Sequence, residues 1–353
     1  MAQRDRQLPD TSAMVGSRFA ECAYGTNGWQ TPAHVYVNEA DDPLGPRGWT
    51  LVAGTPLSYN NWEEILGRQL ATITHIVAGF DLNFGHVPHI AIGTKHGNAC
   101  SAAVGLSPAD VMADMVTGDP RAIFGGLVMV NFEIDVELAE VLLRWKMARG
   151  RRLLDAVCAP SFTPEAVEML DWRKGHKCRV LVNLALAHMT QASLDTAPVV
   201  RQIRGGWLVQ PPFTHVWDLG DPELVVTGEL SWLGQRDLIL AWAIAATSNS
   251  NTITLVRDGQ LLGNGVGQQD RVMCCKLAVT RATQAGHFLT GAVAASDSFF
   301  PFPDGPEVLI AAGVEAILAT SGSVNDEAVR DVCSGSGVAL MWLPDAKARG
   351  FWH

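Results

Sequence analysis

The sequence predicts an α/β protein with layered sheets and helices, on two observations. Short apolar segments of strand length alternate, over most of the chain, with segments whose apolar residues recur at helical spacing. Of the 353 residues, 48% are hydrophobic and 18% are charged, which is typical of a folded globular protein and not of a disordered one. A chain of this length is expected to form two domains or one large α/β unit.

In the first half, a strand, a loop and a helix are predicted between Leu70 and Ala122. Ser107 is the expected N-cap of that helix, with Pro108 at its first position. Residues 1–18 are polar and irregular, and are expected to form an N-terminal arm. The predicted strands are residues 90–92, 127–130 and 153–159; the loop is residues 95–105; two further helices are residues 136–149 and 163–170.

The second half continues the alternation. Asp258-Gly259 predicts a hairpin turn between strands at residues 252–256 and 261–266. A domain boundary is expected near residues 190–205, where Asp195-Thr-Ala-Pro precedes a turn with two glycines. The other predicted strands are residues 291–295, 316–318 and 338–343; the predicted helices are residues 238–246, 270–285, 307–312 and 329–335.

Charge and cysteine content argue against a nucleic-acid-binding, membrane-binding or disulfide-stabilised protein. The formal net charge of −10 argues against non-specific binding to nucleic acid or to acidic membranes, because both need a basic surface. No apolar run reaches membrane-spanning length and the first residues lack the core of a signal peptide, so a cytoplasmic protein is expected. The seven cysteines are odd in number and include no C-x-x-C pair, which favours buried, reduced thiols over disulfides.

The candidate chemistry centres on Lys95-His96, in the run His89-Ile-Ala-Ile-Gly-Thr-Lys-His-Gly-Asn-Ala-Cys100. An imidazole supplies a base near neutral pH, and an adjacent cation stabilises developing negative charge, as a one-step acyl or formyl transfer requires. Taken alone, such a pair is more often a solvated loop. A second run, Ala295-Ser-Asp-Ser-Phe-Phe-Pro-Phe-Pro-Asp304, is not explained by ordinary loop chemistry, and the two runs together point to one enzyme family.

Nine runs, in order from about residue 18 to the end, resemble the aminoimidazole carboxamide ribonucleotide (AICAR) formyltransferase domain of the bifunctional purine-biosynthesis enzymes. The resemblance implies two cytidine-deaminase-like three-layer subdomains, at residues 19–200 and 201–353. We expect no cyclohydrolase domain, because residues 1–18 are too short for one. The runs are Tyr24-Gly-Thr-Asn27, Leu57-Ser-Tyr-Asn-Asn61, Thr94-Lys-His-Gly-Asn-Ala-Cys100, Asp119-Pro-Arg-Ala-Ile-Phe-Gly-Gly126, Gly205-Gly-Trp-Leu-Val-Gln210, Thr247-Ser-Asn-Ser250, Gly263-Asn-Gly-Val-Gly-Gln-Gln-Asp-Arg271, Ala295–Gly305 and Arg349-Gly-Phe-Trp-His353.

The family transfers a formyl group from 10-formyltetrahydrofolate to the 5-amino group of AICAR, and the resemblance implies three catalytic residues. His96 matches the base that takes a proton from this poor amine. Lys95 matches the cation that stabilises the formyl oxyanion or the departing folate nitrogen. Asn249 matches the asparagine that holds the imidazole and the amine; the alternative is a helix C-cap or turn residue.

The resemblance also implies two sets of binding residues. Arg349 matches an arginine that binds the nucleotide, although a solvated tail residue is the alternative. Phe299 and Phe302 either form the folate-side wall or only shape the loop that carries Asp304. The substrate-binding set is Tyr24, Asn60, Phe124, Gly125, Asp155 and Arg349; the cofactor-binding set is Phe299, Phe302, Asp304 and Asn264.

The first motif departs from the family at two positions. Ala23 stands where the family has an arginine that contacts the nucleotide, and Trp29 stands where it has a histidine. Loss of such a charge-assisted contact, worth roughly 1.5–3 kcal/mol, would not be neutral for the same ligand. Three alternatives follow: another cation such as Arg121 or Lys347 replaces the arginine, the same machinery formylates a different amine, or the protein is a non-catalytic binding protein.

The resemblance implies a homodimer with shared active sites, acting on a small nucleotide or another small amine. No metal is predicted, because the deaminase signature H-x-E with P-C-x-x-C is missing and the adjacent Cys274-Cys275 are poorly spaced for chelation. The run Gly263-Asn-Gly-Val-Gly-Gln lacks the G-x-G-x-x-G spacing of a dinucleotide-binding loop, so that function is rejected.

Overall fold

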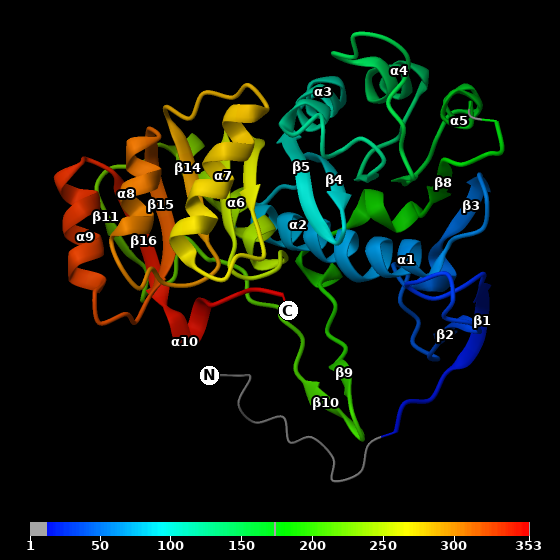
Figure 1. The fold of residues 1–353 in the computed structure, drawn as a ribbon, viewed down its shortest axis with the longest axis horizontal. Helices are drawn as coiled ribbons and strands as arrows, with labels where there is room; N and C mark the ends of the chain where they lie inside the picture. The colour runs from blue at the N-terminus through cyan, green and yellow to red at the C-terminus, as the bar shows by residue number, and fades with distance from the viewer. Residues whose placement is uncertain (1–12, 173, 353) are drawn as a thin grey trace.

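The computed structural model describes residues 13–172 and 174–352, which form sheets and helices in alternation (Figure 1). Most of the arm predicted at residues 1–18 lies outside the described residues. The strands are β1 (Ser17–Cys22), β2 (Ala33–Val37), β3 (Thr50–Ala53), β4 (His89–Lys95), β5 (Asn98–Gly105), β6 (Leu127–Val130), β7 (Ala156–Ala159), β8 (Arg179–Val182), β9 (Val199–Ile203), β10 (Gly206–Gln210), β11 (Val225–Thr227), β12 (Ile253–Arg257), β13 (Gln260–Gly265), β14 (Ala292–Ser296), β15 (Val314–Ser321) and β16 (Ala339–Pro344). The helices are α1 (Tyr59–Trp62), the π-helical η2 (Glu63–Gln69), α2 (Leu70–Phe84), α3 (Pro108–Gly118), α4 (Val136–Arg144), α5 (Pro164–Leu170), α6 (Trp232–Ala246), α7 (Arg271–Gln284), α8 (Asp304–Ala311), α9 (Asp326–Gly335) and α10 (Asp345–Ala348), with short 3₁₀ turns η1 (Pro46–Gly48), η3 (Leu184–His188) and η4 (Gln191–Ser193).

One mixed sheet of 12 strands, in the order β11-β16-β15-β14-β12-β13-β5-β4-β6-β7-β8-β3, runs through the described residues. Its halves are built alike. In each half an antiparallel hairpin, β4–β5 or β12–β13, is followed by three parallel strands, β6-β7-β8 or β14-β15-β16. The hairpins meet in the middle, where β5 pairs antiparallel with β13. This confirms the α/β class; the deaminase-like identity and bounds of the two subdomains stay predictions.

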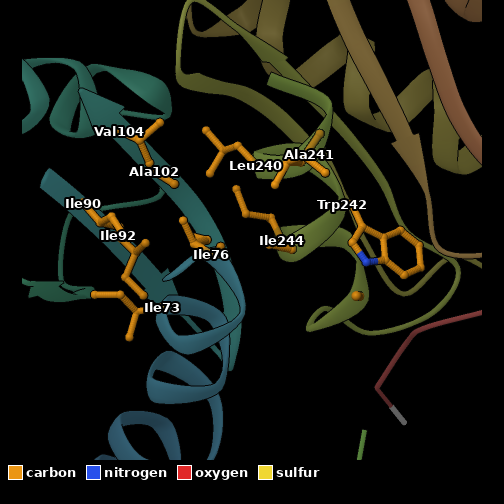
Figure 2. Packing of buried hydrophobic residues seen from close by; sticks show 14 of the residues in the cluster. Ile73, Ile76, Ile90, Ile92, Ala102, Val104, Leu240, Ala241, Trp242 and Ile244 are labelled. Carbon is orange, nitrogen blue, oxygen red and sulfur yellow. The ribbon is translucent and has the colours of Figure 1, made fainter. Parts of the chain in front are cut away.

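Helices cover both faces of the large sheet and separate its core into three clusters. On one face, the central helices α2 and α6 pack together over strands of both halves in a single shared core. Figure 2 shows Ile76 of α2 between Ile92 of β4 and Ile244 of α6, with Ile73 of α2 beside Ile92. On the opposite face, α3, α4 and α5 cover the first half, and α7, α8 and α9 cover the second.

The predicted start of α3 is confirmed, whereas two other predicted bounds differ from the structure. The Ser107 hydroxyl accepts the peptide N–H of Asp110 at 3.3 Å, so Ser107 caps α3 with Pro108 in its first turn. None of the seven cysteines forms a disulfide, and six are buried. The helix predicted at residues 136–149 ends at Arg144, and the strand predicted from residue 153 begins only at Ala156.

Two larger differences from the predicted local structure concern residues 95–105 and 59–84. The segment at residues 95–105, predicted as a loop, is the turn and second strand of the β4–β5 hairpin. The long helical segment at residues 59–84 was not predicted, because residues 72–80 of α2 are all buried and no amphipathic period marks the helix. That helix is buried between the sheet and α6, so a periodic polar face is not needed.

The shared core also holds a polar aromatic cluster. The His75 ring stacks on Phe213 with centroids 5.3 Å apart, and the His215 ring lies edge-on to Trp242 at 6.3 Å. Burial lowers the pKa of His75 and lowers that of His215 to about 4; the nearby Lys347 acts in the same direction on His215 and Asp221 opposes it. Both imidazoles are therefore neutral in the folded protein near pH 7.

Truncating Ile76 is expected to open a cavity in the shared core. Ile76 is fully buried on α2, whereas Leu82 on the same helix is exposed. We expect Ile76→Ala to lower the free energy of unfolding by about 2–5 kcal/mol, and Leu82→Ala by about 1 kcal/mol or less, in urea denaturation. Equal losses in the two variants would contradict this packing.

The lowered pKa of His215 predicts acid sensitivity. An unfolded histidine titrates near pH 6.5, so between pH 6.5 and 4 the unfolded chain binds a proton that folded His215 does not. Stability is therefore lost as the pH falls through this window, by about 2–3 kcal/mol for this residue. In urea unfolding at pH 7.5 and 4.5, His215→Phe should lose less stability than the wild type by that amount. An equal loss in both proteins would rule out this role.

Candidate active site

Lys95 and His96 lie at the tip of the β4–β5 hairpin. Lys95 pairs with Asn98 across a two-residue turn, in which both His96 (φ 54°) and Gly97 (φ 72°) have positive φ. A type I′ hairpin turn requires this conformation, and glycine adopts it without a steric cost. The turn leaves His96 exposed and Gly97 buried. The backbone thus presents the imidazole outward from the sheet edge.

The Lys95 side chain joins the hairpin to the ends of β6 and β7. Its Nζ donates a hydrogen bond to the Phe124 carbonyl at 2.8 Å, and a Cβ added to Gly125 would lie 3.9 Å from it. The Gly125 peptide N–H in turn donates to the Leu153 carbonyl at 2.7 Å. Phe124 and Gly125, both predicted as substrate-binding residues, therefore lie beside Lys95.

Asp155 lies in the same region, and two side chains hold it. Arg179 Nη1 forms an ion pair with Oδ1 at 2.7 Å, and Asn61 Nδ2 donates to Oδ2 at 2.5 Å. The sequence had singled out the neighbouring Asn60, whose side chain instead donates to the Thr26 carbonyl at 3.4 Å. Asn61 and Arg179 were missed, because nothing in the local pattern indicates contacts this distant along the chain.

Asn249 comes from the other half of the sheet and contacts the hairpin directly. Its peptide N–H donates to Asn98 Oδ1 at 3.0 Å, and its Oδ1 accepts from Arg68 Nη2 at 2.7 Å. The Arg68 guanidinium also lies over the Trp352 ring, 4.6 Å from its centroid. Arg68 was not predicted, and it connects the hairpin tip, Asn249 and the C-terminal segment.

A cleft of about 610 Å³ opens next to Asn249, since Ser250 and Asn251 line it. The predicted folate-side residues Phe299, Phe302 and Asp304 line this cleft, as does Arg349. The other residues that line it are Gln269, Asp270, Arg271, Val272, Ser298, Pro301 and Phe351. The cleft is thus lined by aromatic rings, two arginines and two carboxylates.

The charged residues of the cleft have fixed neighbours. Arg349 pairs with Asp345 at 2.6 Å and lies 5.9 Å from the centroids of both Phe299 and Phe351. Arg271, which sequence reasoning missed, forms an ion pair with the buried Asp297 and donates to Asn251 Oδ1 at 2.7 Å. These pairs hold both guanidinium groups at the cleft wall.

Asn264 does not line the cleft. It is buried on β13, where its Nδ2 donates to the Ala99 carbonyl at 2.9 Å and to Ser248 Oγ at 3.2 Å. Its Oδ1 accepts from Thr254 Oγ1 at 2.8 Å. Its amide is therefore used in joining β13 to β5, and we leave it out of the site proposed below.

The divergent first motif lies on the surface connection between β1 and β2. Tyr24 is exposed, and 80% of Trp29 is accessible to solvent. Of the two cations considered as replacements for the missing arginine, Lys347 is paired with Asp221 at 2.6 Å and with Glu223 at 2.7 Å. Arg121 is exposed in the turn that leads to Gly125.

The described residues show no sign of a metal site or of a membrane-spanning helix. They contain no group of three or more His, Cys, Asp or Glu side chains that would hold a metal ion. Within the same ranges, no helix combines the length and apolar character needed to cross a membrane.

Comparison with known proteins decides the family. The sequence model of the AICARFT/IMPCHase bienzyme family matches residues 1–281. The chain belongs to this family. Membership was predicted from the nine runs and is confirmed.

Among its relatives, "Bifunctional purine biosynthesis protein PurH" of Cutibacterium acnes is 33% identical over 98% of this chain and 61% of its own length. The PurH protein of Anoxybacillus flavithermus is 32% identical over 95% of this chain and 60% of its own. This AICARFT/IMPCHase family chain thus spans about 60% of the length of these curated relatives. One solved structure is also similar, a diaminohydroxyphosphoribosylaminopyrimidine deaminase/5-amino-6-(5-phosphoribosylamino)uracil reductase of Thermotoga maritima. The match covers 27% of this chain and 30% of that protein at 18% identity. Its TM-score of 0.20 is too low to support a conclusion about the fold.

Substitution of Gly97 is predicted to destabilise the protein more than substitution of Gly337, a glycine with similar φ in another turn. Both Gly97 (φ 72°) and Gly337 (φ 69°) have positive φ, but a Cβ at Gly97 would lie 3.0 Å from Arg68 Nε, whereas Gly337 faces open space. We expect Gly337→Ala to cost about 1–2 kcal/mol of unfolding free energy, and Gly97→Ala to cost more, because Arg68 must also shift. If thermal or urea unfolding finds Gly97→Ala no worse than Gly337→Ala, the close approach of Arg68 is wrong.

Proposed function

We propose that this protein transfers a formyl group from 10-formyltetrahydrofolate to the 5-amino group of AICAR. The proposal rests on one observation: the tip of the β4–β5 hairpin, which carries Lys95 and His96, contacts Asn249. The cleft lined by Phe299, Phe302 and Asp304 opens beside this contact. Family membership supports it, since the curated relatives are named purine biosynthesis proteins. The relatives are longer, so their whole activity is not assumed for this chain.

His96 is the proposed base. The arylamine of AICAR is a weak nucleophile, because its lone pair is delocalised toward the carboxamide, and it must lose a proton as it attacks. An imidazole accepts that proton near neutral pH. His96 suits this role because the positive-φ turn leaves its ring exposed at the hairpin tip.

Lys95 is the proposed electrostatic partner. One Nζ–H group is used on the Phe124 carbonyl at 2.8 Å, and an ammonium group has two more to donate. Those donors stabilise negative charge that develops on the formyl oxygen, or protonate the folate nitrogen that leaves. The tether to Phe124 fixes the ammonium beside Gly125 and thereby reduces the reorganisation needed during the reaction.

The cleft suits a folate, which when bound supplies the formyl group. Phe299 and Phe302 offer faces for the flat ring system, and the Asp304 carboxylate accepts N–H groups of the ring edge. Asp304 is exposed, and among the described residues its side chain accepts the N–H of Gly305 at 2.8 Å, which leaves acceptor capacity on the carboxylate. We assign four residues to binding of the acceptor nucleotide: Arg349 on the same wall, Tyr24, Asn60 and Asp155.

We also propose that the protein is a homodimer with shared active sites. The β9–β10 hairpin projects away from the large sheet (Figure 1), and it exposes the apolar side chains of Val200, Ile203, Trp207 and Leu208. Exposed apolar groups of this kind mark interaction surfaces. A monomer in sedimentation velocity at assay concentrations would contradict this assembly.

A second candidate keeps the chemistry and changes the acceptor. Ala23 and Trp29 replace two polar residues of the family motif, and Lys347 is already paired with two carboxylates. On this reading the formyl group passes to a different amine. Folate binding with no turnover of AICAR, followed by turnover of another aromatic amine, would favour this candidate.

Loss of the His96 or the Lys95 side chain should abolish most of the activity without unfolding the protein. In an absorbance assay of tetrahydrofolate release with AICAR, we expect His96→Ala to lower kcat by about 10²–10⁴-fold. Lys95→Met should lower it by about 10²–10³-fold. The matched control is His86→Ala, an exposed histidine in the loop after α2, which should retain wild-type kcat. Full activity of His96→Ala would exclude its role as the base.

A further inference from the structure

We propose that Arg68 is a positioning residue for formyl transfer, holding the Asn249 side chain and the His96-Gly97 turn in one arrangement. The kinetic test of this inference rests on the proposed function. The claim that Arg68 holds Asn249 and the turn in place does not depend on it. Arg68 itself is not assigned a contact with substrate. It acts through the two elements that carry the proposed catalytic groups.

The first step is the link between Arg68 and Asn249. Nη2 donates to Asn249 Oδ1 at 2.7 Å, and the guanidinium plane lies 4.6 Å from the centroid of the Trp352 ring. A planar group that is stacked on one side and bonded on its edge has little freedom to rotate. The carboxamide of Asn249 is therefore held in one orientation, with Oδ1 toward Arg68 and the NH₂ group left to point elsewhere.

The second step is the link between Arg68 and the turn. The Arg68 side chain lies against Gly97, so that a Cβ there would come within 3.0 Å of Nε and 3.3 Å of Cγ. Asn98, the next residue, accepts the Asn249 peptide N–H at 3.0 Å. Arg68, the turn and Asn249 thus form a closed set of contacts. Movement of any one of them requires movement of the other two.

The helix that carries Arg68 contributes a second side chain to the turn. Residues 63–69 form a π-helical segment, a geometry that is frequent at functional sites, and Glu64 precedes Arg68 by four positions. Burial raises the pKa of the Glu64 carboxyl, while the nearby His96 ring and the Gly97 peptide N–H act in the opposite direction. Glu64 and Arg68 therefore both lie close to the His96-Gly97 turn.

Burial of Arg68 is not explained by stability alone. Its Nη1 is buried and has no hydrogen-bond partner among the described residues, and burial lowers its pKa. An unpaired N–H of a charged group is costly, so an apolar side chain would serve packing at least as well. A guanidinium at this place is accounted for by the geometry that it imposes on Asn249 and the turn.

The test compares three variants with the wild-type chain of 353 residues. Arg68→Met keeps the length of the side chain and removes the donors; Arg68→Lys keeps a charge and a donor without the planar stack. The matched control is Arg330→Met on α9, which removes an exposed arginine that lies over Trp342 at 5.5 Å, remote from the turn. Steady-state kinetics with 10-formyltetrahydrofolate and AICAR give kcat and both KM values for each protein.

A positioning role predicts a loss in kcat and not in KM. We expect Arg68→Met to lower kcat by about 10–100-fold, with both KM values within about threefold of the wild type, because misplaced catalytic groups impair the reaction more than binding. Arg68→Lys should recover part of this loss, and Arg330→Met should retain wild-type kcat. A kcat of Arg68→Met within twofold of the wild type, or a loss confined to KM, would overturn the proposal.

Hydrogen–deuterium exchange separates this inference from the proposed function. Arg68→Met should accelerate exchange in peptides that cover residues 93–105 and 247–252, whereas Arg330→Met should leave both at wild-type rates. If the wild type does not formylate AICAR, the proposed function fails, and the exchange rates alone decide whether Arg68 holds the turn. Unchanged exchange in both peptides of Arg68→Met would overturn the inference.

Discussion

The antiparallel pairing of β5 with β13 is the constraint on which the site depends. The Val104 peptide N–H donates to the Gly259 carbonyl at 2.9 Å, and Asn264 on β13 donates to the Ala99 carbonyl at 2.9 Å. These bonds join two halves that share one core on the α2–α6 face and have separate helices on the other face. Because β5 is held to the second half, the β4–β5 tip reaches Asn249, which precedes β12. The packing of α2 against α6 and the Arg68–Asn249 hydrogen bond at 2.7 Å add to this junction.

The site combines a rigid backbone with few charged side chains. Two consecutive residues of positive φ set the direction of His96, and a single hydrogen bond to Phe124 sets that of Lys95. Such a tight hairpin holds the imidazole more precisely than a long loop would. The cleft beyond Asn249 is more open, and its two arginines are held by Asp345 and Asp297. Under the proposed function, the hairpin carries the reacting groups and the adjacent loops recognise the ligand.

Local structure was predictable where its cause is local. The Ser107 cap of α3, the Asp258-Gly259 turn and the short buried strands follow from neighbouring residues. The residues around the site were predictable only through the family resemblance. Arg68 escaped both routes, since its partner Asn249 is 181 residues away and no pattern marks the contact. Asn264, by contrast, lies inside a matched run but bonds within the core.

The most direct test of the account follows the formyl carbon itself. The wild-type protein is incubated with AICAR and with 10-formyltetrahydrofolate that carries ¹³C in the formyl group. The products are then separated and their masses are determined by mass spectrometry. The account predicts that the label appears in formyl-AICAR with the wild type and not with His96→Ala. Label that remains on folate, or appears only as free formate while folate binding is intact, would contradict it.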